Sequence, residues 1–171
     1  MAAMAELTFT EVWQQGDPHA QSAAIDFWRA HGLLQAGVDP HQRAEQLCML
    51  VHDGATLVAI STLEIGHLKQ LRRDFLFIRC STAPSHRHQH IATTLVEVSG
   101  RAAQSWSREH PELEIAGLAA VLESPELAPL AQFPVWPVRQ PELTHNAGLN
   151  LVGYTRKGHQ VRVAWFDHIT V

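Results

Sequence analysis

The chain has 171 residues, a mass of 19.0 kDa and a formal net charge of −4, with 46% hydrophobic and 18% charged residues. This length suits a single domain with its own hydrophobic core, and this composition excludes a largely disordered chain. The acidic balance supplies no broad positive field for phosphate groups, so we expect no nucleic-acid partner.

The start of the chain and its two cysteines bear on the compartment. The first residues have neither the basic nor the apolar region of a secretion signal, and no apolar run approaches the ~18 residues of a membrane span. The spacing of Cys48 and Cys80 is typical of neither a zinc module nor a disulfide framework. We therefore expect a cytoplasmic protein with no membrane partner.

The first half of the sequence predicts four strands and two helices. Alternating patterns and short apolar runs predict strands at residues 5–13, 47–52, 56–65 and 75–84. An Asp-Pro pair opens each predicted helix, and the helices are expected at residues 17–32 and 39–46. Asp53-Gly54 stands between two of the apolar runs and is a strong hairpin signal. The last three strands are therefore expected to be antiparallel neighbours.

The second half predicts a long helix, a buried strand and a final hairpin. Apolar residues at helical spacing mark one helix face at Ile91, Leu95, Val98, Ala102 and Trp106. Residues 113–122 predict a buried strand, and residues 149–155 and 160–166 predict a hairpin. Between them, residues 124–142 hold five of the nine prolines and predict an irregular arm with at most short helical turns. The element order indicates an α+β, or mixed α/β, domain.

The segment at residues 75–95 carries the chemistry, because it runs from a strand through a short turn into a helix. A helix start leaves backbone N–H groups unpaired and carries a partial positive charge, which favours a phosphate or pyrophosphate. Arg87 precedes the helix and adds a cationic fork, and the short side chain of Ala92 leaves the backbone accessible.

This segment resembles the acetyl-CoA signature of the GCN5-related N-acetyltransferase (GNAT) superfamily. The signature places Arg or Gln, two residues, Gly, one residue and Gly or Ala after a strand that often ends in Val-x-Pro. Here Arg87-His88-Gln89-His90-Ile91-Ala92 follows Thr82-Ala83-Pro84, with histidine where the family usually has glycine. The resemblance implies one domain over residues 1–171, with a mostly antiparallel central sheet, splayed fourth and fifth strands and helices on both faces.

The resemblance also implies acetyl-CoA as cosubstrate and a set of residues that bind it. The pantetheine arm is expected along the fourth strand, at Ile78, Cys80, Ser81 and Thr82. The pyrophosphate is expected on backbone N–H groups of Arg87, His88, Gln89, His90, Ile91, Ala92 and Thr93. Ser124 stands near the position of an asparagine that contacts CoA in the family. No metal is expected.

The implied reaction is direct transfer of an acetyl group, within a ternary complex, to a primary amine of a small molecule or peptide. Candidates for the base that deprotonates the amine are Glu123 and Glu64, each at the end of a predicted strand. The family's thiolate-protonating tyrosine is missing, because the sole tyrosine, Tyr154, is elsewhere, and His145 is the candidate substitute. The acceptor, the acyl chain length and the pathway stay open.

Two alternatives and one assembly remain open at this point. The departures from the signature favour a catalytically degenerate module that binds acyl-CoA or a protein partner without turnover. Histidines at alternate positions, His86, His88 and His90, allow a transition-metal site instead. The terminal hairpin offers a sheet edge at which a homodimer can form.

Overall fold

The computed structural model describes residues 6–87, 90–136 and 148–170. The chain divides into two compact units. Unit 1 comprises residues 1–63 and 80–102, and unit 2 comprises residues 64–79 and 103–171. No helix in the described part of the chain is long and apolar enough to cross a membrane.

Unit 1 begins with an antiparallel set of strands that forms where the alternating patterns predict it. The strands are β1 (Leu7–Glu11), β2 (Leu47–Asp53) and the first part of β3 (Thr56–Leu68). β2 pairs antiparallel with both β1 and β3, and the β2–β3 ladder closes at the Asp53–Thr56 pair. Gly54 has a φ of 59°, a left-handed conformation that costs glycine little, so the predicted hairpin at Asp53-Gly54 is confirmed.

The two helices of unit 1 that precede β2 begin at the predicted Asp-Pro pairs. They are α1 (Pro18–Ala30) and α2 (Pro40–Ala44). The carboxylates of Asp17 and Asp39 each accept a hydrogen bond, 2.9 Å long, from the backbone N–H two residues later. Proline follows each aspartate at the first helical position. Its missing N–H costs no hydrogen bond there, because an N–H at that position has no intrahelical partner. Local sequence alone therefore determines where both helices begin.

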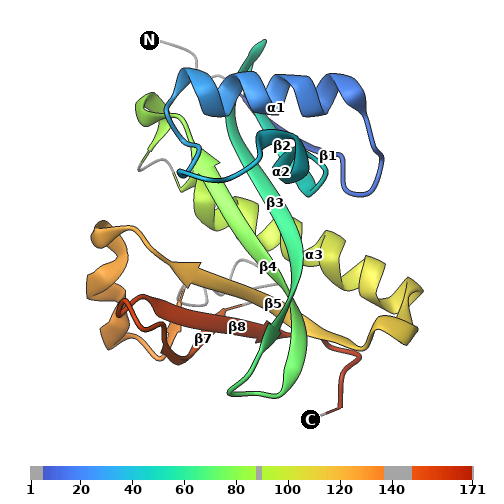
Figure 1. Ribbon diagram of the computed structural model, residues 1–171, viewed down its shortest axis with the longest axis vertical. Coiled ribbons are helices and arrows are strands. Elements are labelled where there is room, and N and C mark those ends of the chain that lie inside the picture. The colour runs from blue at the N-terminus through green and yellow to red at the C-terminus, as the bar shows by residue number, and fades with distance from the viewer. Residues whose placement is uncertain (1–5, 88–89, 137–147, 171) are drawn as a thin grey trace. The chain divides into compact units, whose positions relative to one another are not determined.

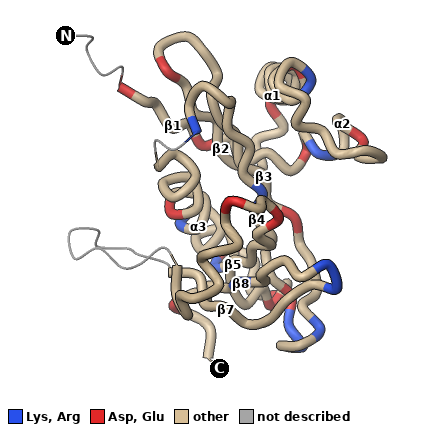
Figure 2. The backbone as a smooth tube through the Cα atoms, turned by 90° about the vertical axis from the view of Figure 1, so that its left-hand side faces the viewer, with Lys and Arg blue, Asp and Glu red and all other residues tan. Residues whose placement is uncertain are grey.

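Helices cover both faces of the strands of unit 1. Figures 1 and 2 show α1 and α2 on one face and the start of α3 (Ile91–Glu109) on the other. The α1 face is apolar, and fully buried Trp28 and Ala24 pack there against Leu50 and Ile60 of the strands. On the α3 side, the buried hydroxyl oxygens of Ser61 and Ser99 lie 2.7 Å apart.

The sheet order is β1-β2-β3-β4-β5-β8-β7-β6. The strands not yet bounded are β4 (Arg73–Thr82), β5 (Ile115–Leu122), β6 (Val135–Trp136), β7 (Leu149–Tyr154) and β8 (Gln160–Trp165). The β5–β8, β7–β8 and β6–β7 pairs are antiparallel, and the β4–β5 pair is parallel. This mostly antiparallel sheet with helices confirms the predicted α+β class.

The parallel β4–β5 ladder is short. It runs from the Asp74–Ile115 pair to the Phe77–Ala119 pair, and in the described part of the chain no β5 residue pairs with Ile78 or Arg79. β5 continues in its antiparallel ladder with β8 as far as Leu122. Within unit 2, the parallel ladder therefore ends before Ile78 and Arg79 of β4.

The structure differs from the sequence prediction in the loops. The predicted polar loop before residue 75 is shorter, because β3 extends to Leu68 and β4 starts at Arg73, where His67 Nδ1 and Asp74 Oδ1 lie 2.6 Å apart. Three short 3₁₀ helices join the long elements, η1 (Pro84–His86), η2 (Pro111–Leu113) and η3 (Pro125–Gln132). η3 and β6 give the proline-rich arm more regular structure than predicted. β6 also pairs with the start of β7, which leaves less free edge on the terminal hairpin.

Candidate functional site

The turn between β4 and α3 is fixed to its neighbours by backbone hydrogen bonds. Ala83 donates its N–H to the carbonyl of Val58 on β3 at 2.8 Å. Pro84 then opens η1, and the N–H of His86 bonds to the carbonyl of Ala83 at 2.9 Å. Arg87 follows in an extended conformation and is exposed. The segment that the sequence singled out therefore starts from a firmly held turn and presents Arg87 to solvent.

His90, the residue before α3, has a left-handed backbone with a φ of 59°. Its carbonyl accepts hydrogen bonds from the N–H of Thr94 at 3.1 Å and from the Thr94 hydroxyl at 3.2 Å. A left-handed conformation costs a residue with a Cβ about 1–2 kcal/mol, whereas glycine adopts it freely. His90 thus stands at a signature glycine position and has the conformation that favours glycine there.

Replacing His90 by glycine is expected to stabilise the chain by about 1 kcal/mol, because the left-handed strain disappears while glycine's larger unfolded-state entropy offsets part of the gain. Urea unfolding followed by tryptophan fluorescence measures this change. Arg72→Gly is the matched control. Arg72 is also exposed and left-handed, with a φ of 52°, but it lies outside this turn. A His90→Gly variant that is less stable than the parent would show that the imidazole makes contacts worth more than the strain.

The predicted pantetheine residues occupy the second half of β4. Ile78 and Ser81 are buried, whereas Cys80 and Thr82 are half-buried. Ser81 Oγ accepts a hydrogen bond from Arg43 Nη2 at 3.3 Å. Burial raises the pKa of the Cys80 thiol to about 12, so the sulfur stays protonated near neutral pH. Cys80 is therefore a neutral thiol on the strand near neutral pH.

The structure divides the predicted residues between the two units. Unit 1 holds Cys80, Ser81, Thr82, Arg87, His90, Ile91, Ala92 and Thr93 within one continuous strand–turn–helix segment. Unit 2 holds Ile78, Glu64, Glu123 and Ser124. His88, Gln89 and His145 lie outside the described residues. Of the described members of the expected pyrophosphate set, His90, Ile91, Ala92 and Thr93 lie at the start of α3, and Arg87 directly follows η1.

The two candidate bases and Ser124 lie on the surface of unit 2. Glu64 is exposed within β3, and Glu123 is exposed directly after β5. Glu64 is therefore not at the end of its strand, since β3 continues to Leu68. Ser124 is the N-cap residue of η3, and its side chain makes no capping hydrogen bond.

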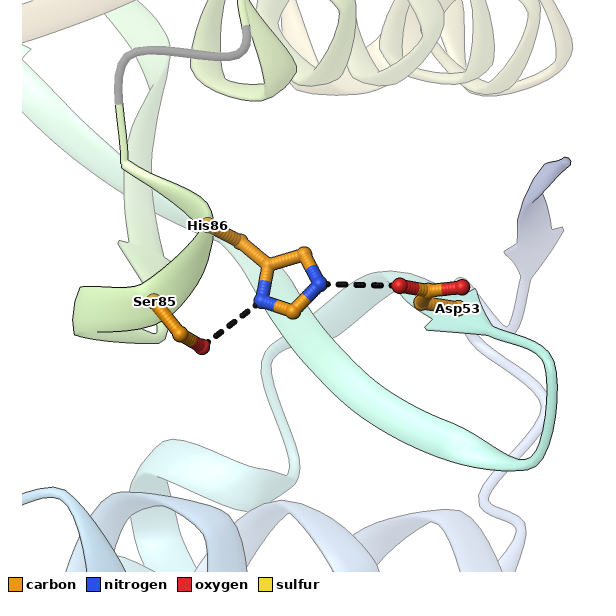
Figure 3. A network of polar contacts seen from close by, with 3 residues as sticks. All are labelled: Asp53, Ser85 and His86. Carbon is orange, nitrogen blue, oxygen red and sulfur yellow. Dashed lines mark hydrogen bonds and ion pairs between the residues drawn. The ribbon is translucent and has the colours of Figure 1, made fainter. Parts of the chain in front are cut away.

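A polar network at this turn was not predicted from the sequence. Figure 3 shows His86 between Ser85, its neighbour on η1, and Asp53 at the end of β2. His86 Nε2 lies 3.0 Å from Asp53 Oδ2, and His86 Nδ1 lies 2.8 Å from Ser85 Oγ. The sequence indicated Asp53 as a turn residue and His86 as a metal-ligand candidate, and no spacing signal links positions 33 residues apart. Only the hairpin fold brings them together.

The described residues contain no group of three metal-ligating side chains. Both ring nitrogens of His86 face other polar groups, and the His90 carbonyl accepts hydrogen bonds from Thr94 in the first turn of α3. His88, the middle member of the alternating histidines, lies outside the described residues. Within the described chain, the histidines of this segment therefore serve the turn and the helix start.

The proline-rich arm is held on unit 2 by two buried polar residues of β8 that the sequence analysis missed. Gln160 Nε2 donates to the carbonyl of Leu127 at 2.9 Å. Arg162, fully buried, donates hydrogen bonds of 3.0 Å or shorter to Gln160 Oε1 and to the carbonyls of Leu149, Leu130 and Phe133. The available signal was a charged residue between valines in a predicted strand. The described part of the arm is thus a fixed element of unit 2.

Neither a protein-family model nor a curated protein sequence matches the chain. Solved structures do match it over nearly its whole length.

Two of these structures are named as acetyltransferases, and a third is a complex with acetyl-CoA. The ribosomal-protein-S18-alanine N-acetyltransferase from Escherichia coli has a TM-score of 0.56 at 11% identity, covering 97% of this chain and 100% of that one. NAA60 from Arabidopsis thaliana, in complex with acetyl-CoA, has a TM-score of 0.55 at 11% identity, covering 95% and 99%. An acetyltransferase of the GNAT family from Streptococcus pneumoniae has a TM-score of 0.55 at 12% identity, covering 92% and 96%.

These similarities each cover more than nine tenths of this chain. At such low identity they establish the architecture, and the activity has to be argued from the residues. The chain has the fold of the GCN5-related N-acetyltransferases.

Proposed function

We propose that the chain is a divergent GNAT-family N-acetyltransferase, a single functional domain over residues 1–171, that transfers an acetyl group from acetyl-CoA to a primary amine. The observation that carries the proposal is the firmly held turn between β4 and α3. The turn presents exposed Arg87, and His90, the residue directly before α3, has the left-handed backbone of the signature glycine. A helix start of this kind is suited to a pyrophosphate.

In this proposal, the backbone N–H groups at the start of α3 and the Arg87 guanidinium bind the pyrophosphate. The pantetheine arm lies along β4 beyond Phe77, where the backbone no longer pairs with β5. Glu64 or Glu123 accepts the ammonium proton of the acceptor, and His145 returns a proton to the CoA thiolate. The acceptor is a small molecule or a peptide.

The proposal is tested by calorimetric titration of acetyl-CoA and free CoA into tag-free protein. Arg87→Ala is expected to weaken the Kd about tenfold or more, because a charge-assisted contact worth about 1.5–3 kcal/mol is lost. Arg29→Ala is the matched control, since Arg29 is also an exposed arginine of unit 1 but lies in the last turn of α1. An unchanged Kd for Arg87→Ala would place the cofactor elsewhere, and no binding of either ligand would overturn the proposal.

The degenerate binding module remains the second candidate, favoured by the histidine at a signature glycine position. Release of the CoA thiol in a screen of primary amines separates the two functions. Binding with thiol release supports the transferase, whereas binding without release from any amine supports the module.

A further inference from the structure

We propose that Ser85 is an activated nucleophile that accepts acyl groups from small activated esters, with His86 as its base and Asp53 as the group that orients the base. This activity goes beyond the proposed acetyltransferase function and does not require acyl-CoA. All three residues belong to unit 1.

The hydrogen bonds define where the protons lie. An ionised carboxylate only accepts, so His86 Nε2 donates its proton to Asp53 Oδ2 across 3.0 Å. In the tautomer that carries its single proton on Nε2, Nδ1 is an acceptor, and the Ser85 hydroxyl, 2.8 Å away, is its donor. This proton order is the one that a serine–histidine–carboxylate triad needs, although the two ring nitrogens exchange places relative to the serine proteases.

The histidine and the carboxylate of the network are partly buried, whereas the serine is exposed. The side chains of His86 and Asp53 expose only 18% and 31% of their surface, whereas Ser85 is exposed. Partial shielding strengthens the bond between the carboxylate and the imidazole, which stabilises the imidazolium that forms when the serine loses its proton. The exposed hydroxyl leaves the attacking oxygen accessible to an ester in solution.

The turn that holds Ser85 is rigid before any substrate arrives. Proline at position 84 fixes φ, and the turn is tied to β3 through the 2.8 Å bond from Ala83 to Val58.

The reaction balances with the ester as the only co-reactant. Ser85 Oγ attacks the ester carbonyl carbon while its proton moves to His86 Nδ1. A new Oγ–C bond forms and the C–O bond to the leaving group breaks. The leaving alkoxide takes the proton from the imidazolium, and an O-acyl serine remains.

The test uses p-nitrophenyl acetate and the full chain. Acyl-imidazoles from the twelve histidines hydrolyse quickly, so the readout is the time course of stable acetylation at Ser85, measured by intact-mass spectrometry and peptide mapping. Ser124 is an internal control, because it is an exposed serine whose side chain makes no capping hydrogen bond. We expect acetylation at Ser85 and none at Ser124.

Variants separate activation from mere exposure. Asp53→Asn is expected to slow acetylation at Ser85 about 100-fold. An amide does not hold the histidine proton on Nε2 as a carboxylate does, so Nδ1 is no longer kept free to accept the serine proton. Asp26→Asn, in an exposed position of α1, is expected to leave the rate unchanged. Ser85→Ala removes the hydroxyl that is acetylated, so the acetylated peptide is no longer detected. The change is too small to disturb the fold. Each variant is checked by its thermal unfolding midpoint.

Two results would overturn the proposal. One is the absence of acetyl-Ser85 in the parent chain. The other is an equal rate of Ser85 acetylation in Asp53→Asn, which would make the network a structural link between η1 and the β2–β3 hairpin. Calorimetry with acetyl-CoA on the same variants reports the proposed acetyltransferase function separately.

Discussion

Replacing Arg162 by methionine is expected to destabilise the folded chain by about 3–5 kcal/mol. Arg162 is fully buried in β8, and its guanidinium donates to the carbonyls of Leu130, Phe133 and Leu149. Methionine fills a similar length but donates no hydrogen bond, so these buried carbonyls lose their partner. Urea unfolding followed by tryptophan fluorescence measures the loss.

The arm over residues 125–136 is expected to respond first. The carbonyls of Leu130, Phe133 and Pro134 all belong to this arm, and each accepts a hydrogen bond from Arg162 of β8. Limited proteolysis of Arg162→Met should therefore cut this segment earlier than in the parent chain. Arg162→Lys keeps the charge but lacks the planar fork, so an intermediate loss is expected. Arg156→Met, an exposed arginine in the β7–β8 turn, should change stability by less than about 0.5 kcal/mol.

A loss below about 1 kcal/mol for Arg162→Met would contradict this account of the arm. Burial lowers the pKa of the Arg162 guanidinium, which nevertheless stays protonated at neutral pH. Among the described residues no carboxylate pairs with it, so the charge is satisfied by carbonyl dipoles alone. These bonds, and the charge they stabilise, explain why an arginine stands between two buried valines of β8.

Replacing Gly117 by alanine is expected to destabilise the chain by about 3 kcal/mol or more. Gly117 lies in β5 opposite Trp165 of β8, and a Cβ there would lie 2.1 Å from the carbonyl oxygen of Ala164. The nearest atoms all belong to the backbone of Ala164 and Trp165, so no side-chain rotation relieves the clash. Relief requires β5 and β8 to separate, which breaks their ladder.

Gly153→Ala is the matched control, because a Cβ at Gly153 of β7 would lie 3.5 Å from the Gln70 side chain, an ordinary contact. Its stability should stay within about 0.5 kcal/mol of the parent in the same urea titration. Equal stability of Gly117→Ala and Gly153→Ala would show that the β5–β8 backbones are not as close as described. The register shift of the β4–β5 ladder between Asp74 and Leu76 falls beside Gly117, as expected where glycine marks a strand irregularity.

Much of the fold was predictable because its signals are local. Asp17 and Asp39 cap their helices through backbone groups two residues away, and Asp53-Gly54 forms its turn from its own torsion preferences. The strand–turn–helix segment and its resemblance to a known signature gave the predicted architecture, which the structure confirms. The end of β3 and the start of β4 were not predictable, because both strands continue past the apolar pattern, to Leu68 and from Arg73.

The sequence by itself determined the order of the long helices and strands and the starts of α1 and α2, since each depends on neighbours within a few residues. The tertiary structure alone decided which side chains act on one another over long separations. Asp53 reaches His86, Arg162 reaches the carbonyls of the arm, and β8 approaches β5 so closely that only glycine fits at position 117. These contacts depend on how strands pair and pack, and residue spacing does not encode that.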